Sequence, residues 1–218
     1  MSSNHPLNAF EISRVYGEFQ ALAPTNLTLC AGQVAVLTGP NGAGKSTLLN
    51  CLSGLLRPTT GTISVAGYDL YADEREAKRN LAFVPDVPRF YPELSAWEHL
   101  QFMALAHNAG SGFAERAERL LREFGLWEAR HLYPHNYSRG MRLKLGLLLA
   151  LIRPFKVLLL DEPTSALDVE SVELLIARLA DLRRQGNGIL LSTHTPAIAD
   201  GLADRHLTLR NGLLAEEA

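Results

Sequence analysis

The 218-residue sequence lacks most features that mark secreted or nucleic-acid-binding proteins. It contains two cysteines, Cys30 and Cys51, which are too few for a disulfide framework and do not form a CxxC pair. A reducing, cytoplasmic setting is therefore expected. The 21 basic and 23 acidic residues nearly balance, and no run of one sign stands out. This pattern argues against a nucleic-acid partner.

Long hydrophobic runs are also missing. The longest are Leu145 to Ile152 and Val157 to Leu160, and charged residues and a proline separate them. A membrane-spanning helix needs about 20 apolar residues. The polar start, Met1 to Leu7, does not read as a signal peptide. We expect a soluble chain that reaches a membrane only through a spanning partner, with its acidic end, Glu216-Glu217-Ala218, as a solvated tail.

What the sequence does contain is an alternation of short apolar stretches and helical patterns, which predicts an α/β fold with a parallel-rich sheet. The expected strands are Phe10 to Tyr16, Asn26 to Leu29, Val34 to Leu37, Thr62 to Val65, Leu81 to Val84, Val157 to Leu160, Ile189 to Leu191 and Leu207 to Leu209. The expected helices are Lys45 to Leu55, one opening at a Ser95/Glu98 capping box, Glu115 to Phe124, Ser138 to Ile152 and Val169 to Arg184. We predict one domain over 1–218, with a core at about 1–85 and 155–218 and a helical lobe at about 87–153.

A glycine-rich segment between the strand at Val34 and the next helix carries the strongest chemical signal. It reads Gly39-Pro40-Asn41-Gly42-Ala43-Gly44-Lys45-Ser46-Thr47 and matches the phosphate-binding P-loop in full. Its glycines let backbone N–H groups wrap closely around a phosphate. Lys45 would neutralise phosphate charge and Ser46 would ligate Mg²⁺. The alternative, a glycine-rich turn with a chance lysine, does not explain the strand and helix on either side.

Two carboxylates end the apolar run at Val157 to Leu160. Ligands of parallel sheets bind at the carboxyl ends of the strands, where Asp161 and Glu162 would lie. Asp161 is placed to hold magnesium, and Glu162 could activate a water for attack on a γ-phosphate. The alternative is an ordinary strand that ends in solvated acids.

Two further segments gain meaning only beside the P-loop. His194 follows the strand at Ile189 to Leu191, so it would lie at the same sheet edge and could sense a γ-phosphate, although a histidine there is more often structural. Ser138 can cap the helix that follows it, whose N-terminal end favours an anion.

Together these residues resemble the nucleotide-binding subunit of ABC transporters over nearly the whole chain. The segment Gly39 to Thr47 resembles the Walker A motif. The segment Val157 to Glu162 resembles the Walker B motif with its catalytic glutamate, and the segment Ser165 to Asp168 resembles the D-loop. His194 resembles the switch histidine. Tyr16 stands where the family places an aromatic residue that stacks on adenine. The resemblance implies a P-loop NTPase fold with antiparallel N-terminal strands and an inserted helical lobe, and ATP hydrolysis with ATP and Mg²⁺.

The sequence departs from the family pattern in two places, the signature motif and Asp86. The signature motif, usually LSGGQ, here reads Tyr137-Ser138-Arg139-Gly140-Met141. In the family this motif reaches the γ-phosphate of a partner's nucleotide, so Ser138, Arg139 and Gly140 would act in trans. Arg139 adds charge that could strengthen or crowd that contact, and we expect hydrolysis that is reduced but not absent. Asp86 replaces a glutamine that touches magnesium, and a carboxylate can still coordinate it.

The resemblance implies two partners, a second ABC ATPase subunit, in a homo- or heterodimer, and an integral membrane transporter subunit, with this chain peripheral at the cytoplasmic face. Exposed aromatics within Val87 to Leu100 would lie near the docking surface, although core packing explains Trp97 equally well. The run Arg89 to Ser95 is similar to export-type branches. A soluble ABC ATPase of DNA repair or translation is the alternative, but the long coiled-coil insertions or paired cassettes usual there are missing. A P-loop kinase would lack the Ser138 lobe, and a GTPase would normally show NKxD.

Overall fold

A computed structural model describes residues 5–194 and 201–216. The chain divides into two compact units. The first contains Met1–Phe83, Phe155–Glu162 and Ile176–Ala218, and the second contains Val84–Pro154 and Pro163–Leu175. The second unit thus holds the helical lobe and also a segment that follows Glu162.

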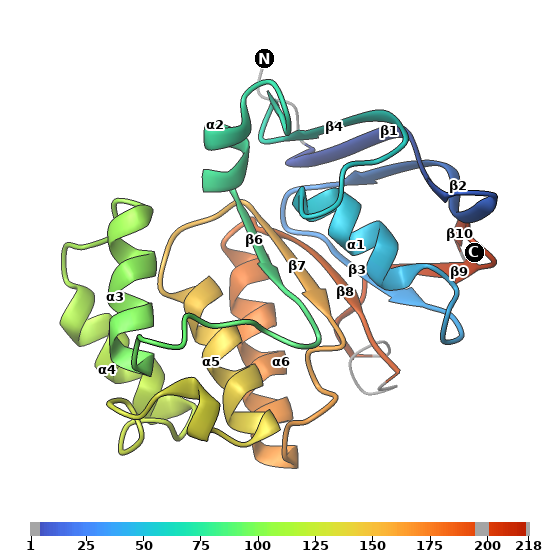
Figure 1. The fold of residues 1–218 in the computed structure, drawn as a ribbon. Helices are drawn as coiled ribbons and strands as arrows, with labels where there is room; N and C mark the ends of the chain where they lie inside the picture. The colour runs from blue at the N-terminus through green and yellow to red at the C-terminus, as the bar shows by residue number, and fades with distance from the viewer. Residues whose placement is uncertain (1–4, 195–200, 217–218) are drawn as a thin grey trace. The chain divides into compact units, whose positions relative to one another are not determined.

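The main sheet of the first unit has the strand order β10-β9-β3-β8-β7-β6 (Figure 1). Its strands are β3 (Val34–Thr38), β6 (Leu81–Val84), β7 (Val157–Asp161), β8 (Gly188–Ser192), β9 (Arg205–Arg210) and β10 (Leu213–Glu216). β3 runs parallel to β8 and β9, and β7 runs parallel to β8. Every residue of β7 and β8 is buried, which is why these strands read as continuous apolar runs.

The C-terminal strand β10 corrects the expectation of an acidic solvated tail. β10 pairs with β9 in antiparallel fashion through Glu216. The Arg205 guanidinium donates to both Glu216 carboxylate oxygens, each at 2.8 Å. This bidentate pair lowers the pKa of Glu216 through the hydrogen bonds it supplies. The expectation was wrong for Glu216, because the acid is paired by a residue of the neighbouring strand. Glu217 and Ala218 lie outside the described residues.

A second sheet is antiparallel, with the order β2-β1-β4-β5. Its strands are β1 (Leu7–Tyr16), β2 (Phe19–Leu29), β4 (Thr60–Val65) and β5 (Tyr68–Asp69). β2 is longer than expected, since the sequence pattern predicted a strand only over Asn26 to Leu29, the last four residues of β2. Ala21, Ala23 and Pro24 are poor strand formers, so pairing with β1 decides the structure there.

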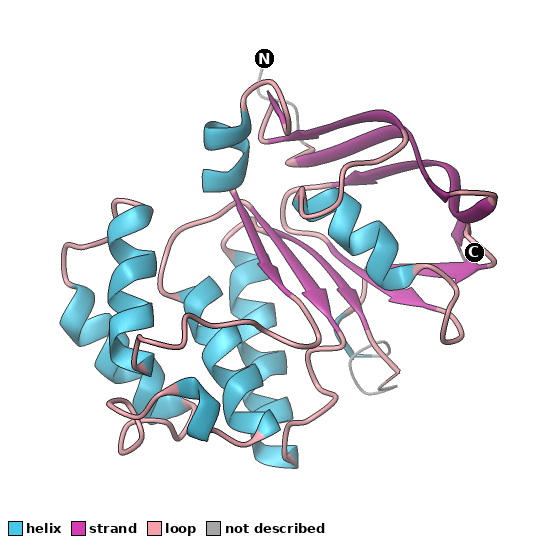
Figure 2. Ribbon diagram, in the orientation of Figure 1, coloured by secondary structure: helices cyan, strands magenta, loops and turns pink. Residues whose placement is uncertain are grey.

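Helix α1 (Lys45–Ser53) lies between the two sheets and contacts β7 and β2 (Figures 1 and 2). Its buried face carries Leu48, Leu49 and Leu52. It ends at Ser53, two residues earlier than expected, because Gly54 adopts a left-handed conformation and its N–H bonds to Cys51. The short helix α2 (Glu74–Arg79) was not predicted, since only one of its residues is buried and it has no apolar period.

The second unit is built on three helices, α3 (Ala96–Ala106), α4 (Phe113–Glu123) and α5 (Arg139–Leu151), with the 3-10 turn η1 (Pro134–Asn136). α3 contacts both other helices. The capping box before α3 is confirmed, because Ser95 and Glu98 each cap the other's backbone N–H. Helix α6 (Val169–Arg184) divides between the two units. Within the described ranges, no helix combines the length and apolar character needed to cross a membrane.

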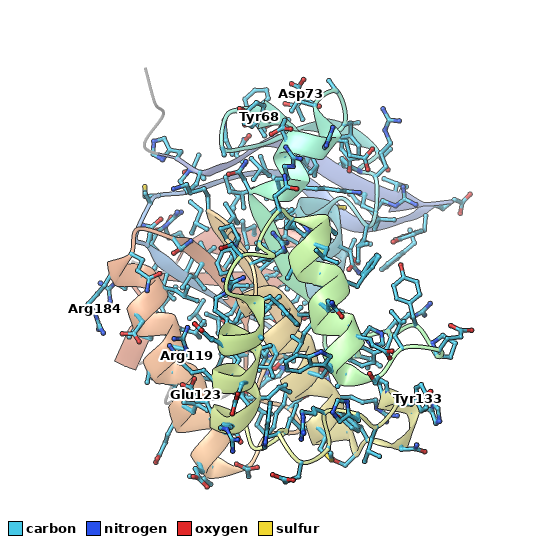
Figure 3. All side chains as sticks on the ribbon, turned by 90° about the vertical axis from the view of Figure 1, so that its left-hand side faces the viewer. Tyr68, Asp73, Arg119, Glu123, Tyr133 and Arg184 are labelled. Atoms are coloured by element: carbon cyan, nitrogen blue, oxygen red, sulfur yellow. The ribbon has the colours of Figure 1, made fainter. Side chains whose placement is uncertain are left out.

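Helix α4 is amphipathic, and the spacing of its apolar residues decides which of its side chains are buried in the lobe. Ala117, Leu120 and Leu121 are buried, whereas Arg119 on the same helix is exposed (Figure 3). The Trp97 ring lies 5.2 Å from the Phe113 ring, centroid to centroid. Of the two roles left open for Trp97, this contact supports packing within the lobe.

Because β7 is buried on both faces, shortening a side chain at its centre should lower the stability of the first unit strongly. Leu159 is fully buried, and Leu159→Ala should lower the free energy of unfolding by about 2–5 kcal/mol. Leu55→Ala is the control, since Leu55 is 69% exposed and its truncation should change stability by under about 0.5 kcal/mol. Urea denaturation of both variants measures the difference, and equal effects would contradict this account of the core.

Candidate active site

The P-loop segment Gly39–Thr47 joins β3 to α1, and two of its glycines are required by close backbone packing. Gly39 has φ 144°, and a Cβ there would lie 2.2 Å from the Leu209 carbonyl oxygen. Gly44 has φ 105°, and its Cβ would lie 2.5 Å from the Ala21 carbonyl oxygen. Both conformation and space therefore exclude a side chain, which fixes the path of the loop.

The loop ends at the N-terminus of α1. Gly44 is the N-cap residue and offers no side chain to cap the first N–H groups of the helix. Those N–H groups and the positive end of the helix can therefore serve an anion. Ala43 is buried and anchors the loop, and its carbonyl oxygen accepts from the Gly212 N–H at 3.0 Å. The exposed residues of the loop are Pro40, Asn41, Gly42 and Ser46, and Thr47 is half-buried.

The Lys45 side chain is buried and points back along the loop. Its Nζ donates to the Gly39 carbonyl oxygen at 2.7 Å and lies 3.4 Å from that of Pro40. Nζ also lies 3.3 Å from His194 Nε2. The cation is thus held within the loop by two backbone carbonyl oxygens, which do not neutralise its charge, so the charge is available to a bound phosphate.

The acidic pair after β7 is organised by Ser192, a residue that the sequence pattern did not single out as functional. Asp161 is buried, and its Oδ1 accepts from Ser192 Oγ at 2.7 Å. The same hydroxyl oxygen accepts from the Glu162 N–H at 2.9 Å. The sequence does contain a sign of this role. Ser192 is a polar residue at the carboxyl end of the otherwise apolar strand β8, and ligands of parallel sheets bind at the carboxyl ends of the strands.

Glu162 and His194 lie together at this edge. Glu162 has φ 48°, a left-handed conformation that is rare for residues other than glycine and that clusters at functional sites. Its Oε1 lies 3.2 Å from His194 Nε2 but accepts no hydrogen bond within the described part of the chain. A proton on Nε2 would face Glu162, and an unprotonated Nε2 would accept from Lys45. Lys45, Glu162 and His194, which come from three distant segments, therefore meet.

The residues expected to hold Mg²⁺ fit a small, hard cation only in part. Asp161 keeps one carboxylate oxygen beyond the Ser192 bond, and Ser46 is the exposed second residue of α1. Within the described residues, no three His, Cys, Asp or Glu side chains are grouped to hold a metal. Asp161 and Ser46 offer oxygen ligands of the kind that Mg²⁺ prefers, and Mg²⁺ commonly binds through one or two protein ligands and takes the rest from phosphates and water.

Tyr16 is the last residue of β1 and is 44% exposed. The Arg14 guanidinium lies 4.5 Å from the ring centroid, so one face of the ring is already covered. A base could stack only on the other face. The adenine contact of Tyr16 stays a prediction.

In the second unit, Ser138 caps α5, and its Oγ accepts from the Met141 N–H at 3.2 Å. The preceding Tyr137 is buried and donates to the Ala129 carbonyl oxygen at 2.7 Å, and burial raises its pKa to about 12. Gly140 lies close to the segment after β7, since a Cβ there would be 2.6 Å from the Ala166 carbonyl oxygen. These contacts fix the backbone at the start of α5 and leave Ser138 exposed.

Two of the residues that depart from the family pattern, Arg139 and Asp86, contact one another. Arg139 Nη2 donates to Asp86 Oδ1 at 3.2 Å, and the two form an ion pair. Ser165 joins them, donating to Asp86 Oδ1 at 2.8 Å and accepting from Arg139 Nη2 at 3.2 Å. No sequence pattern indicated this cluster, because its residues are far apart along the chain. A role for Asp86 as a magnesium contact stays a prediction.

Comparison with known proteins agrees with this site. The family profile described as ABC transporter matches residues 22–165. The chain is 32% identical to the SkfA peptide export ATP-binding protein SkfE of Bacillus subtilis, over 94% of this chain and 86% of that protein. It is 36% identical to the methionine import ATP-binding protein MetN of Brucella abortus, over 95% of this chain and 58% of that protein.

Among solved structures, the dimeric post-hydrolysis state of the ATP-binding cassette MJ0796, bound to ADP and Pi, superposes with a TM-score of 0.88. The two sequences are 25% identical, and the match covers 97% of each chain. The fold predicted from the sequence is confirmed.

The packing of Gly44 predicts a loss of nucleotide binding without unfolding. Gly44→Ala should weaken binding of a fluorescent ATP analogue at least about tenfold, because the added Cβ overlaps backbone and displaces the loop. Gly67→Ala is the matched control, since Gly67 has φ 88° and no atom within 4 Å of the added Cβ. It should cost only about 1 kcal/mol of stability from its backbone conformation and leave binding intact. Equal affinities for the two variants would contradict this role of Gly44.

Proposed function

This chain belongs to the ABC transporter family of ATP-hydrolysing cassettes, and we propose that it powers a transporter through ATP-driven dimerisation with a second cassette. The observation that carries the proposal is the meeting of Lys45, Glu162 and His194 within 3.3 Å contacts beside a complete P-loop. Phosphoryl transfer needs positioning and charge stabilisation more than covalent chemistry, and these three groups supply a positive charge, a carboxylate and an imidazole beside the phosphate-binding loop.

Each side chain has a distinct task in this proposal. The loop N–H groups and Lys45 bind the β- and γ-phosphates. Glu162 accepts a proton from the attacking water, a step for which its Oε1 is suited because it accepts no hydrogen bond from the described residues. His194 contacts the γ-phosphate and reports its loss. Ser46 and Asp161 would hold Mg²⁺, which neutralises phosphate charge, and Asp86 is a further candidate contact.

The proposed dimer places two copies head to tail. Each ATP would lie between the P-loop of one copy and the segment from Ser138 to Gly140 of the other. The closed dimer would bind ATP more tightly than ADP. This difference in affinity would drive the dimer open after hydrolysis. The dimeric structure of MJ0796 supports this proposal by analogy.

The membrane partner is proposed from the family and from apolar residues of the second unit. Val87, Tyr91, Phe102 and Leu105 are large hydrophobic side chains that are all exposed. Such residues are enriched at interfaces. We place the chain peripherally at the cytoplasmic face of the membrane. Relatives include an importer and an exporter, and we propose export because the run Arg89 to Ser95 is similar to export-type branches.

The competing candidate is an ABC ATPase that works without a transporter, in DNA repair or translation. It would need no spanning partner. Purification from detergent-solubilised membranes separates the two, because only a transporter subunit should remain bound to a membrane protein through several steps.

The dimer proposal predicts the behaviour of a variant that cannot hydrolyse ATP. Glu162→Gln should shift from monomer to dimer on size-exclusion chromatography when Mg-ATP is added, and wild type should not accumulate as a dimer. The physical reason is that the amide cannot accept the water's proton, so the ATP-bound state persists.

The control carries Lys45→Ala in the Glu162→Gln background. It removes the phosphate-binding charge and should stay monomeric at the same ATP concentration. A Glu162→Gln protein that stays monomeric at saturating Mg-ATP would count against dimerisation of the isolated chain.

A further inference from the structure

The ion pair between Asp86 and Arg139 joins two residues that replace uncharged residues of the family pattern. Arg139 is the first residue of α5 and directly follows Ser138, and Asp86 follows β6. Both side chains belong to the second unit. The Arg139 guanidinium reaches both Asp86 and Ser165 through a single nitrogen, Nη2. Its ion pair with Asp86 is therefore monodentate.

The geometry indicates a pair that can open. The Arg139 side chain is 60% exposed and that of Asp86 is 38% exposed, and their 3.2 Å separation is long for a charge-assisted hydrogen bond. Exposed ion pairs of this kind contribute little net stability. A phosphate offers the guanidinium two parallel hydrogen bonds and more negative charge, so it is the stronger acceptor.

The pair is also not needed to hold α5 in place. Lys144, which follows Arg139 further along α5, donates to Asp168 Oδ2 at 3.1 Å. Asp168 is fixed by Ser171 and by Lys144, and these bonds lower its pKa. The Gly140 backbone lies against Ala166 as well. A purely structural role for the Asp86–Arg139 pair would therefore duplicate contacts that already exist.

We propose that Asp86 is an internal anion that competes with the γ-phosphate of a second copy's ATP for the Arg139 guanidinium. The inference rests on the proposed dimer, in which Ser138 and its neighbours face that phosphate. With ADP, no γ-phosphate is present and the Asp86–Arg139 pair stays closed. With ATP, the guanidinium transfers from carboxylate to phosphate. Asp86 then acts as a positioning residue that sets how much ATP is needed for closure.

The test measures the ATP concentration that gives half-maximal dimer in the Glu162→Gln background. Asp86→Asn keeps the side-chain shape but removes the competing charge, so it should lower this concentration by about two- to fivefold, the range expected for an exposed ion pair. In a protein that also carries Arg139→Gln, Asp86→Asn should change it by less than about 1.5-fold, because no guanidinium remains to be released. The dimer level with ADP should stay at baseline in all variants.

Lys144→Gln is the matched control. It removes the neighbouring ion pair on the same helix and should leave the ATP requirement within about 1.5-fold of the parent. An Asp86→Asn shift of equal size with and without Arg139 would overturn the inference, since it would show a long-range charge effect. A raised ATP or Mg²⁺ requirement in Asp86→Asn would also overturn it and would favour direct metal contact. Absence of any ATP-dependent dimer in the Glu162→Gln parent would contradict the dimer proposal itself and, with it, this inference.

Discussion

The parallel register of β3, β8 and β7 is the constraint on which the candidate site depends. Ser192 at the end of β8 is in register with Leu37 of β3 on one side and with Asp161 of β7 on the other. Because parallel strands end at the same edge, the segments that follow them must meet there. The P-loop, the acidic pair and His194 are such segments. A shift of one residue in either pairing would turn Asp161 to the opposite face.

This edge of the sheet is polar within an apolar interior, and hydrogen bonding makes that arrangement tolerable. Asp161, Ser192 and Thr193 are all buried. The Ser192 hydroxyl serves both the Asp161 carboxylate and the Glu162 N–H, so buried polar groups are satisfied. Glu162 has a left-handed backbone conformation, and its Oε1 accepts no hydrogen bond from the described residues although it lies 3.2 Å from His194 Nε2. The strained backbone conformation thus belongs to Glu162, the residue proposed to react with water. Strained conformations are known to cluster at functional sites.

Sequence reasoning succeeded where the signal is local and failed where it depends on pairing. The P-loop and the acids after β7 are short, contiguous patterns whose chemistry is independent of the rest of the chain. β10 was missed because Leu213–Glu216 is stabilised by β9 and by the Arg205 pair with Glu216. The partnership of Asp86 with Arg139 could not be predicted from spacing, because only tertiary structure brings the two segments together. Each was recognised alone as a departure from a pattern, without its partner.

Shared catalytic sites are the central claim, and mixing two inactive variants tests it most directly. Lys45→Ala removes the phosphate-binding lysine, and Ser138→Ala removes the serine proposed to act on the other copy's nucleotide. A dimer of one variant with the other contains one site with both defects and one intact site. The account predicts that mixing the two inactive proteins restores ATP hydrolysis, because each mixed dimer contains one intact site. A mixture no more active than the sum of its components would contradict it.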